Sequence, residues 1–102
     1  MLCAHTVRRL KPGTFEQFQE VFGPPGEAPP GWVRFHMLRN LADPDEVVTF
    51  GFFDGTLEEM ERGQQDEGYY ELRDKVAQLI ESTPVNGVYE IVKSEVLDSA
   101  AR

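Results

Sequence analysis

The chain has 102 residues, of which 40% are hydrophobic and 11% aromatic, and it carries a formal net charge of −8. This length and composition fit one packed domain and argue against a disordered chain. Residues 54–81 hold nine acidic against three basic side chains, and such a surface repels phosphate backbones and anionic lipids. We therefore expect no nucleic acid and no membrane as partner, and these acids suit a solvated helix face.

Targeting signals are not recognisable in the sequence. No apolar run approaches the roughly 20 residues of a transmembrane helix, and the first residues lack the basic and apolar pattern of a signal peptide. Cys3 is the single cysteine and cannot form an internal disulfide. A reducing compartment, with the cytoplasm as the default, is the expected location.

Four segments have the composition of strands and are bounded by Gly, Pro, Asp or Asn. Lys11-Pro12-Gly13 turns the chain after the first, and the Asp43-Pro44 turn predicts that the second and third pair as a hairpin. The segments are residues 2–10, 32–41, 46–53 and 85–93.

Two helical regions separate these strands. Phe15, Phe18 and Phe22 recur at helical spacing in a short helix that stops before Gly23, and Thr14 with Gln17 fits a capping box at its start. The four prolines from Gly23 to Gly31 predict a loop.

The second helical region is predicted in two pieces, 56–63 and 69–81. Thr56 with Glu59 repeats the capping-box pattern at the start of the first piece. The second piece has the clearest helical period, and Pro84 marks its stop. The apolar positions of that period are Tyr69, Leu72, Val76 and Leu79.

The predicted order is strand–helix–strand, twice. This order indicates an α+β fold of the ferredoxin-like, split βαβ type, with four antiparallel strands and the helices on one face of the sheet. Residues 1–96 are expected to form the single domain, and residues 97–102 a disordered tail.

The third strand has apolar residues on both faces: Val47, Val48, Phe50, Phe52 and Phe53. Two helical regions cover one face, so the other would expose roughly several hundred Å² of apolar surface. A second copy of the chain is the simplest cover, which predicts a homodimer whose sheets face each other. The alternation places Trp32 with His36 and Phe35 with Met37, and it leaves open which face meets the helices, because a one-residue slip exchanges the faces.

Several short motifs carry a resemblance to a known family over roughly residues 2–93. They are Arg9-Leu10-Lys11-Pro12-Gly13-Thr14, Pro30-Gly31-Trp32-Val33, Leu38-Arg39-Asn40, Gly51-Phe52-Phe53-Asp54 and Gly87-Val88-Tyr89-Glu90. With the element order, they make the sequence similar to the antibiotic-biosynthesis monooxygenase-like proteins of the dimeric α+β barrel superfamily. Most of these motifs are turns, caps and strand openings, which support a fold better than a reaction.

The resemblance implies a homodimer with a small, largely apolar cavity in each protomer between the sheet and the helices. Some members oxygenate phenolic or quinol substrates with O2 and without metal or flavin, others degrade haem, and many have no established activity. The haem-degrading members use an Asn on the first strand and a Trp and a His on the second helical region. Here His5 and Thr6 stand at the Asn position, and Thr56–Glu81 holds no Trp and no His, so haem degradation is not favoured.

His36 is the candidate catalytic residue. A histidine among aromatic neighbours could take the proton of a phenol and leave an anion able to react with O2; an interface or exposed histidine is the alternative reading. His5 shares a strand face with Cys3, but a nucleophile pair would need a third, orienting group, so a buried inert thiol is favoured. The two histidines show no metal-ligand spacing, so we expect no metal.

Five residues are candidates for substrate binding. Trp32 and Tyr70 could stack on a flat ring, and Arg62 and Arg73 could bind a carboxylate or phenolate. His5 completes the set. The alternatives are that the aromatic side chains fill the core and the interface and that the arginines pair with neighbouring acids. No phosphate-binding glycine motif is present, so no nucleotide cofactor is expected.

The sequence thus predicts a cofactor-independent monooxygenase, an oxidoreductase that acts on a small aromatic or quinol-type compound. The alternative is a non-catalytic dimeric α+β barrel that binds a small hydrophobic ligand or has a regulatory role.

Overall fold

The computed structural model describes residues 1–22, 30–63 and 73–98. Its strands and helices follow the predicted order: β1 (Leu2–Leu10), α1 (Phe15–Val21), β2 (Trp32–Arg39), β3 (Glu46–Phe53), α2 (Leu57–Gly63) and β4 (Ile80–Glu90). Residues 73–77 are also helical. The strands form one antiparallel sheet in the order β2-β3-β1-β4, which confirms the predicted α+β architecture.

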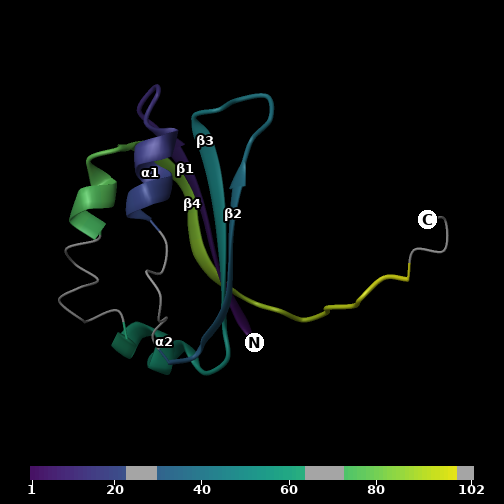
Figure 1. The fold of residues 1–102 in the computed structure, drawn as a ribbon. Coiled ribbons are helices and arrows are strands. Elements are labelled where there is room, and N and C mark those ends of the chain that lie inside the picture. Colours follow the sequence, from purple (N-terminus) through teal and green to yellow (C-terminus); the bar gives the residue numbers. More distant parts are fainter. Residues whose placement is uncertain (23–29, 64–72, 99–102) are drawn as a thin grey trace.

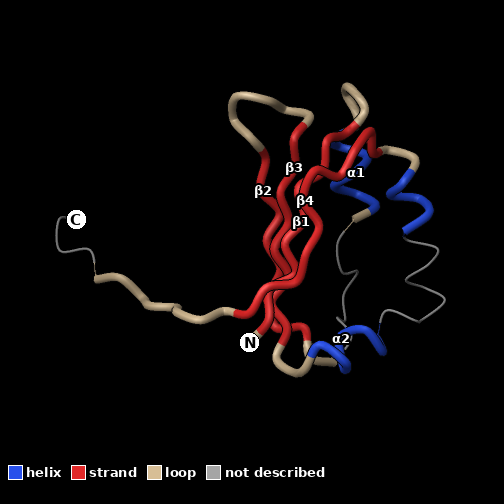
Figure 2. Tube along the Cα trace, turned by 180° about the vertical axis from the view of Figure 1, so that it is seen from behind, coloured by secondary structure: helices blue, strands red, loops and turns tan. Residues whose placement is uncertain are grey.

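The described helices all lie on one side of the sheet, as Figure 1 and the reverse view in Figure 2 both show. No helix in the described ranges has the length and apolar character needed to cross a bilayer. The other side of the sheet carries no described helix, which is the arrangement that the predicted element order implied.

The core lies between α1, residues 73–77 and one end of the sheet. Leu10, Phe18, Val47 and Val76 are buried there, and Phe15, Phe22 and Leu79 pack against them. The predicted helical stripe of α1 is therefore confirmed, as are Val76 and Leu79 of the second helical region. Tyr69 and Leu72 lie outside the described residues.

The last strand begins earlier than predicted. β4 runs from Ile80 to Glu90 instead of 85–93, and the chain turns at residues 78 and 79, so the predicted helix end at Glu81 and the stop at Pro84 are wrong. Pro84 lies inside β4. β4 is an edge strand, and its register against β1 shifts between Val7 and Leu10. An edge strand with such an irregularity accepts a residue that lacks a backbone N–H.

The two predicted capping boxes behave differently. At α2, the Glu59 N–H donates to Thr56 Oγ1 at 3.1 Å and the Thr56 N–H donates to Glu59 Oε1 at 3.2 Å, so this capping box is confirmed. At α1, Thr14 makes no side-chain cap, and its hydroxyl donates instead to the Lys11 carbonyl at 2.7 Å. The prediction was wrong there because the local turn offers the hydroxyl a competing acceptor.

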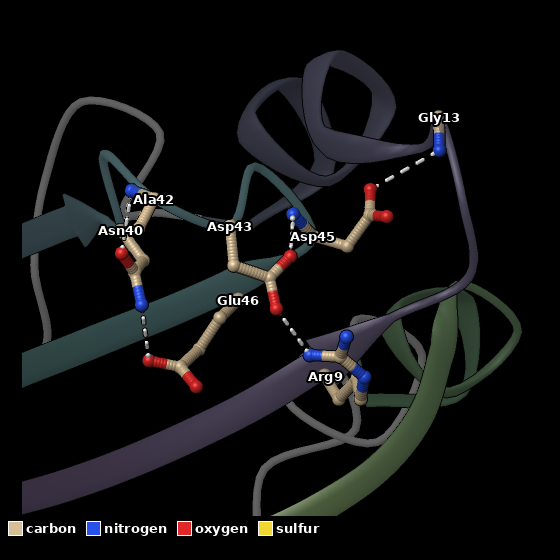
Figure 3. A network of polar contacts seen from close by, with 7 residues as sticks. All are labelled: Arg9, Gly13, Asn40, Ala42, Asp43, Asp45 and Glu46. Atoms are coloured by element: carbon tan, nitrogen blue, oxygen red, sulfur yellow. Dashed lines mark hydrogen bonds and ion pairs between the residues drawn. The ribbon is translucent and has the colours of Figure 1, made fainter.

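Polar contacts fix the turn between β2 and β3 (Figure 3). Asn40 Oδ1 accepts from the Ala42 N–H at 2.8 Å, and Asp43 Oδ1 accepts from the Asp45 N–H at 3.1 Å. Asn40 Nδ2 donates to Glu46 Oε1 at 3.1 Å. These bonds close the turn in one geometry, and the turn geometry sets the strand register.

That register decides which residues face the helices. Val47, Thr49, Gly51 and Phe53 of β3 lie on the helix side, where all four are buried. We call the opposite surface the open face. The pairing assigns ten mostly apolar or aromatic residues to it: Cys3, His5, Val7, His36, Leu38, Val48, Phe50, Phe52, Val85 and Tyr89. Charged side chains lie at its ends, with Arg34 beside Phe52 and Arg9 beside Glu46.

Trp32 lies on the helix side, with Phe35 and Met37, instead of sharing a face with His36 as predicted. The register between β2 and β3 shifts between Trp32 and Arg34. An extra residue at such an irregularity reverses the alternation of side chains along one strand. Trp32 therefore pairs with Phe53 and joins the helix layer.

Beyond β4 the chain leaves the sheet. The Ile91 N–H donates to the Met1 carbonyl at 3.0 Å, after which residues 92–98 run away from the domain on the side opposite to the helices (Figures 1 and 2). Val92, Val96 and Leu97 are 88%, 101% and 83% exposed. Of the predicted tail, residues 99–102 lie outside the described part.

Candidate functional site

A cavity of about 360 Å³ lies on the helix side of the sheet, where β2 begins and β3 ends beside α2. Its described lining comes from three consecutive parts of the fold: the start of β2, the end of β3 and α2. The lining residues are Pro30, Gly31, Trp32, Phe53, Asp54, Glu59, Met60, Arg62 and Gly63. This is the location, between sheet and helices, that the family resemblance implied.

The wall of the cavity is aromatic. The rings of Trp32 and Phe53 meet edge to face, with 5.2 Å between centroids and 70° between planes. Phe53 and Met60 are almost fully buried, and the Asp54 N–H donates to the Gly31 carbonyl at 2.7 Å, which holds the ends of β2 and β3 together. Such a wall can contact a flat hydrophobic ring.

The rim of the cavity is charged. Arg62 lies in the last turn of α2 and makes a 3.4 Å ion pair with Glu58, one helical turn earlier. Both side chains are largely exposed, so this pair holds the guanidinium weakly. Glu59 faces the N-terminal cap of α2, where its carboxylate accepts the Thr56 hydroxyl at 3.0 Å. Asp54, at the end of β3, is exposed.

The structure brings together two of the predicted substrate-binding residues, Trp32 and Arg62, which line the same cavity. Arg73 is exposed and is not among the described residues of the lining. Tyr70 lies outside the described residues. The surface pairing that the sequence offered as an alternative for the arginines is present for Arg62.

The structure places both histidines on the open face, across the sheet from the cavity. His5 stacks on Phe50 with 4.7 Å between centroids and 12° between planes. His36 meets the edge of Phe52 at 5.9 Å and 89°. Both histidines pair in register with Phe50, so they lie on either side of it. In the described ranges, no group of three or more His, Cys, Asp and Glu side chains could hold a metal ion.

Cys3 shares the open face with His5, as predicted, and is 8% exposed. Burial raises the pKa of its thiol above the ordinary value. A raised pKa lowers the fraction of thiolate at neutral pH, and the thiolate is the nucleophile. The expectation of a buried thiol is confirmed.

Phe53, Asp54 and Met60 line the cavity but were not predicted as site residues. One signal in the sequence could have pointed to Phe53, since Gly31 and Gly55 both lie against its ring and Gly55 is only two residues away. A large aromatic residue beside glycines is a candidate for a tightly enclosed wall. The burial of Met60 depends on how α2 docks, which local sequence does not encode.

No protein-family profile matches the chain, and no curated protein matches it. Solved structures do. A protein from Chloroflexus aurantiacus J-10-fl that carries the name of an antibiotic biosynthesis monooxygenase matches with 13% identity and a TM-score of 0.79, over 95% of this chain and 98% of that one. One from Nitrosomonas europaea matches with 20% identity and a TM-score of 0.70, over 91% and 100% of the two chains.

SnoaB, a cofactor-independent oxygenase from Streptomyces nogalater, matches with 16% identity and a TM-score of 0.73, over 91% of this chain and 94% of that one. Identities this low establish a common fold and leave the reaction to be argued from the site. The chain therefore has the ferredoxin-like α+β fold of the antibiotic biosynthesis monooxygenase proteins.

Proposed function

We propose that the chain is a cofactor-independent oxygenase that uses O2 to oxidise a small aromatic or quinol-type compound in the cavity beside α2. The observation that carries this proposal is the aromatic wall of Trp32 and Phe53 in a cavity of about 360 Å³ with a cationic residue at its rim. This volume lies in the range of small-molecule sites, roughly 300 to 1,000 Å³. The fold shared with an enzyme of this class supports the same assignment.

The cavity suits a ring that carries a hydroxyl group. The ring lies against Trp32 and Phe53, and its oxygen points to the rim, where the Arg62 guanidinium favours the anionic form of the substrate. Asp54 and Glu59 are the carboxylates of the described lining. Glu59 is engaged in the cap of α2, so we assign Asp54 as the acceptor of the hydroxyl proton.

The substrate itself supplies the electrons. The substrate anion passes one electron to O2, and the resulting superoxide and ring radical combine into a carbon-bound peroxide anion. This anion takes back the proton held by Asp54 and becomes a hydroperoxide. Loss of water from the hydroperoxide then leaves a carbonyl group. For an anthrone, the sum is anthrone plus O2 giving anthraquinone plus water, which balances without any further reductant. The protein contributes binding, orientation and stabilisation of the anion.

Oxygen uptake with a panel of quinols and anthrones tests this function. We expect uptake above the buffer blank with at least one compound, and a loss of about tenfold or more in kcat/KM for Trp32→Ala and for Arg62→Gln. Lys93→Gln is the matched control for the arginine, because Lys93 is an exposed cation outside the cavity lining. Absence of uptake with every compound contradicts the proposal.

A binding protein without catalysis is the second candidate. It is favoured by one observation: neither histidine is among the described residues of the cavity, since both lie on the open face. This candidate predicts that a flat aromatic compound such as 2-naphthol binds beside Trp32 while no compound of the panel consumes O2. Calorimetric binding measured beside oxygen uptake separates the two candidates.

We further propose that a second copy of the chain covers the open face. The face is a continuous surface across all four strands, and Leu38 and Tyr89 on it are 45% and 50% exposed. The exposed apolar residues after β4 leave the domain on the same side. Exposed apolar surface on a sheet face favours association, and two equal faces meet in a twofold dimer.

A further inference from the structure

We propose that Gly51 is a specificity-determining residue, because it sets the position of the Trp32 indole and thereby the width of the cavity beside α2. The inference rests on the cavity of the proposed function and extends it to the size of ring that binds there. It concerns a glycine that does not line the cavity itself.

Gly51 lies on the helix side of β3, between Ala4 of β1 and Phe35 of β2 in register. A Cβ atom at this position would lie 2.7 Å from Cζ3, 3.3 Å from Cε3 and 3.6 Å from Cη2 of Trp32. All three atoms belong to the six-membered ring of the indole. The missing side chain at position 51 therefore lets this ring lie directly against the backbone of the sheet.

A methyl group at position 51 would displace the indole. The sheet backbone cannot yield, because β3 is bonded on both sides by β1 and β2. The indole would have to move off the sheet, toward the helix layer and into the cavity. Its neighbour Phe53 cannot make room, since Gly31 and Gly55 enclose the Phe53 ring. The expected result is a narrower cavity with its rim unchanged.

Among the glycines that lie against the Trp32 and Phe53 rings, Gly51 is the one to substitute, because its backbone conformation also suits an alanine. Gly31 has a φ of +98°, which an L-residue adopts only with strain, so a substitution there changes the backbone as well as the space. Gly51 is not among the described glycines with positive φ. Gly51→Ala therefore changes the space alone.

Two probes of different width test the inference by calorimetry: 2-naphthol, with two fused rings, and phenol, with one. We expect Gly51→Ala to raise the Kd of 2-naphthol about tenfold and that of phenol by less than about twofold. Gly87→Ala is the matched control, because Gly87 is also a strand glycine whose Cβ would meet an aromatic ring, that of Tyr89 at 3.1 Å, but it lies on the open face and outside the cavity lining. It should leave both values unchanged.

A second measurement needs neither ligand nor turnover. Trp32 is the single tryptophan, so quenching of the intrinsic fluorescence by acrylamide reports on this one indole. We expect a higher quenching constant in Gly51→Ala than in the wild type and in Gly87→Ala. In a Trp32→Leu background, Gly51→Ala should no longer discriminate between the two probes, since the clashing ring is gone.

The inference is overturned by equal losses for the two probes, by an unchanged quenching constant, or by the same discrimination in the Trp32→Leu background. A wild-type protein that binds neither probe overturns it as well. Failure of the oxygenase proposal has a separate signature: both probes bind as expected and the quinol panel consumes no O2.

Discussion

Arg9 of β1 donates to Asp43 Oδ2 at 2.7 Å, so the turn between β2 and β3 is anchored to the neighbouring strand β1 (Figure 3). The same carboxylate accepts the Asp45 N–H through its other oxygen. Arg9 and this N–H together hold the pKa of Asp43 below its ordinary value. The folded state therefore favours the ionised carboxylate.

Folding stability should depend on pH through Asp43. A carboxyl group with a depressed pKa contributes stability above its unfolded pKa of about 3.9 and loses that contribution as the pH falls through its lower, folded-state pKa. Asp43→Asn keeps the Oδ1 acceptor and removes the charge, so we expect its urea midpoint to lie below that of the wild type at pH 6 and to converge with it near pH 2. Asp98→Asn should follow the wild type throughout. A constant difference from pH 6 to pH 2 would rule out the linkage.

The cap of α2 should contribute more stability than the hydroxyl before α1. We expect Thr56→Ala to lower the free energy of unfolding by about 1 kcal/mol, because it leaves the Glu59 N–H without its side-chain acceptor. Thr14→Ala removes no cap and should cost clearly less. Urea unfolding of the two variants gives the comparison, and equal losses would argue against the assigned cap.

A charge on the open face should separate the proposed dimer. Phe50 lies in the middle of that face between His5 and His36, so Phe50→Asp would bury a carboxylate against apolar surface. By light scattering at micromolar concentration, we expect the wild type at twice the chain mass of 11.6 kDa and Phe50→Asp at the mass of one chain. Leu41→Asp, at a fully exposed turn position, should remain dimeric. A wild-type mass of one chain refutes the dimer.

His36 should affect association more than turnover. It lies across the sheet from the cavity, so with the protein held at a concentration where it is fully dimeric, we expect kcat for His36→Ala within about twofold of the wild type. Phe50→Asp, which we expect to separate the proposed dimer and which lies outside the cavity lining, would show how much activity depends on association. A hundredfold loss of kcat in dimeric His36→Ala would instead assign His36 the proton-accepting role.

Local signals determined much of this fold. Three signals each act over a few residues and predict a helix stripe, a helix cap and a turn. The structure contains all three. The signals are the period of Phe15, Phe18 and Phe22, the Thr56–Glu59 pair and the Asp43-Pro44 turn. The apolar character of both faces of β3 was equally local. It indicated that both faces of the sheet need cover, while the element order placed the helices on one face only.

Only the tertiary structure decided which face that was. Side chains along a strand alternate between the two faces. The register shift between Trp32 and Arg34 therefore places Trp32 on the cavity side and leaves His36 on the open face. The spacing of the two residues in the sequence does not show this difference. Strand pairing also decided that β4 starts at Ile80. The partner strand β1 extends to Leu10, which pairs with Ile80. The residues that follow Ile80 therefore belong to a strand, although the local pattern had assigned the first of them to a helix. The residues that can build a site were fixed by composition, and the side of the sheet on which each of them acts was fixed by hydrogen bonds between strands distant in sequence.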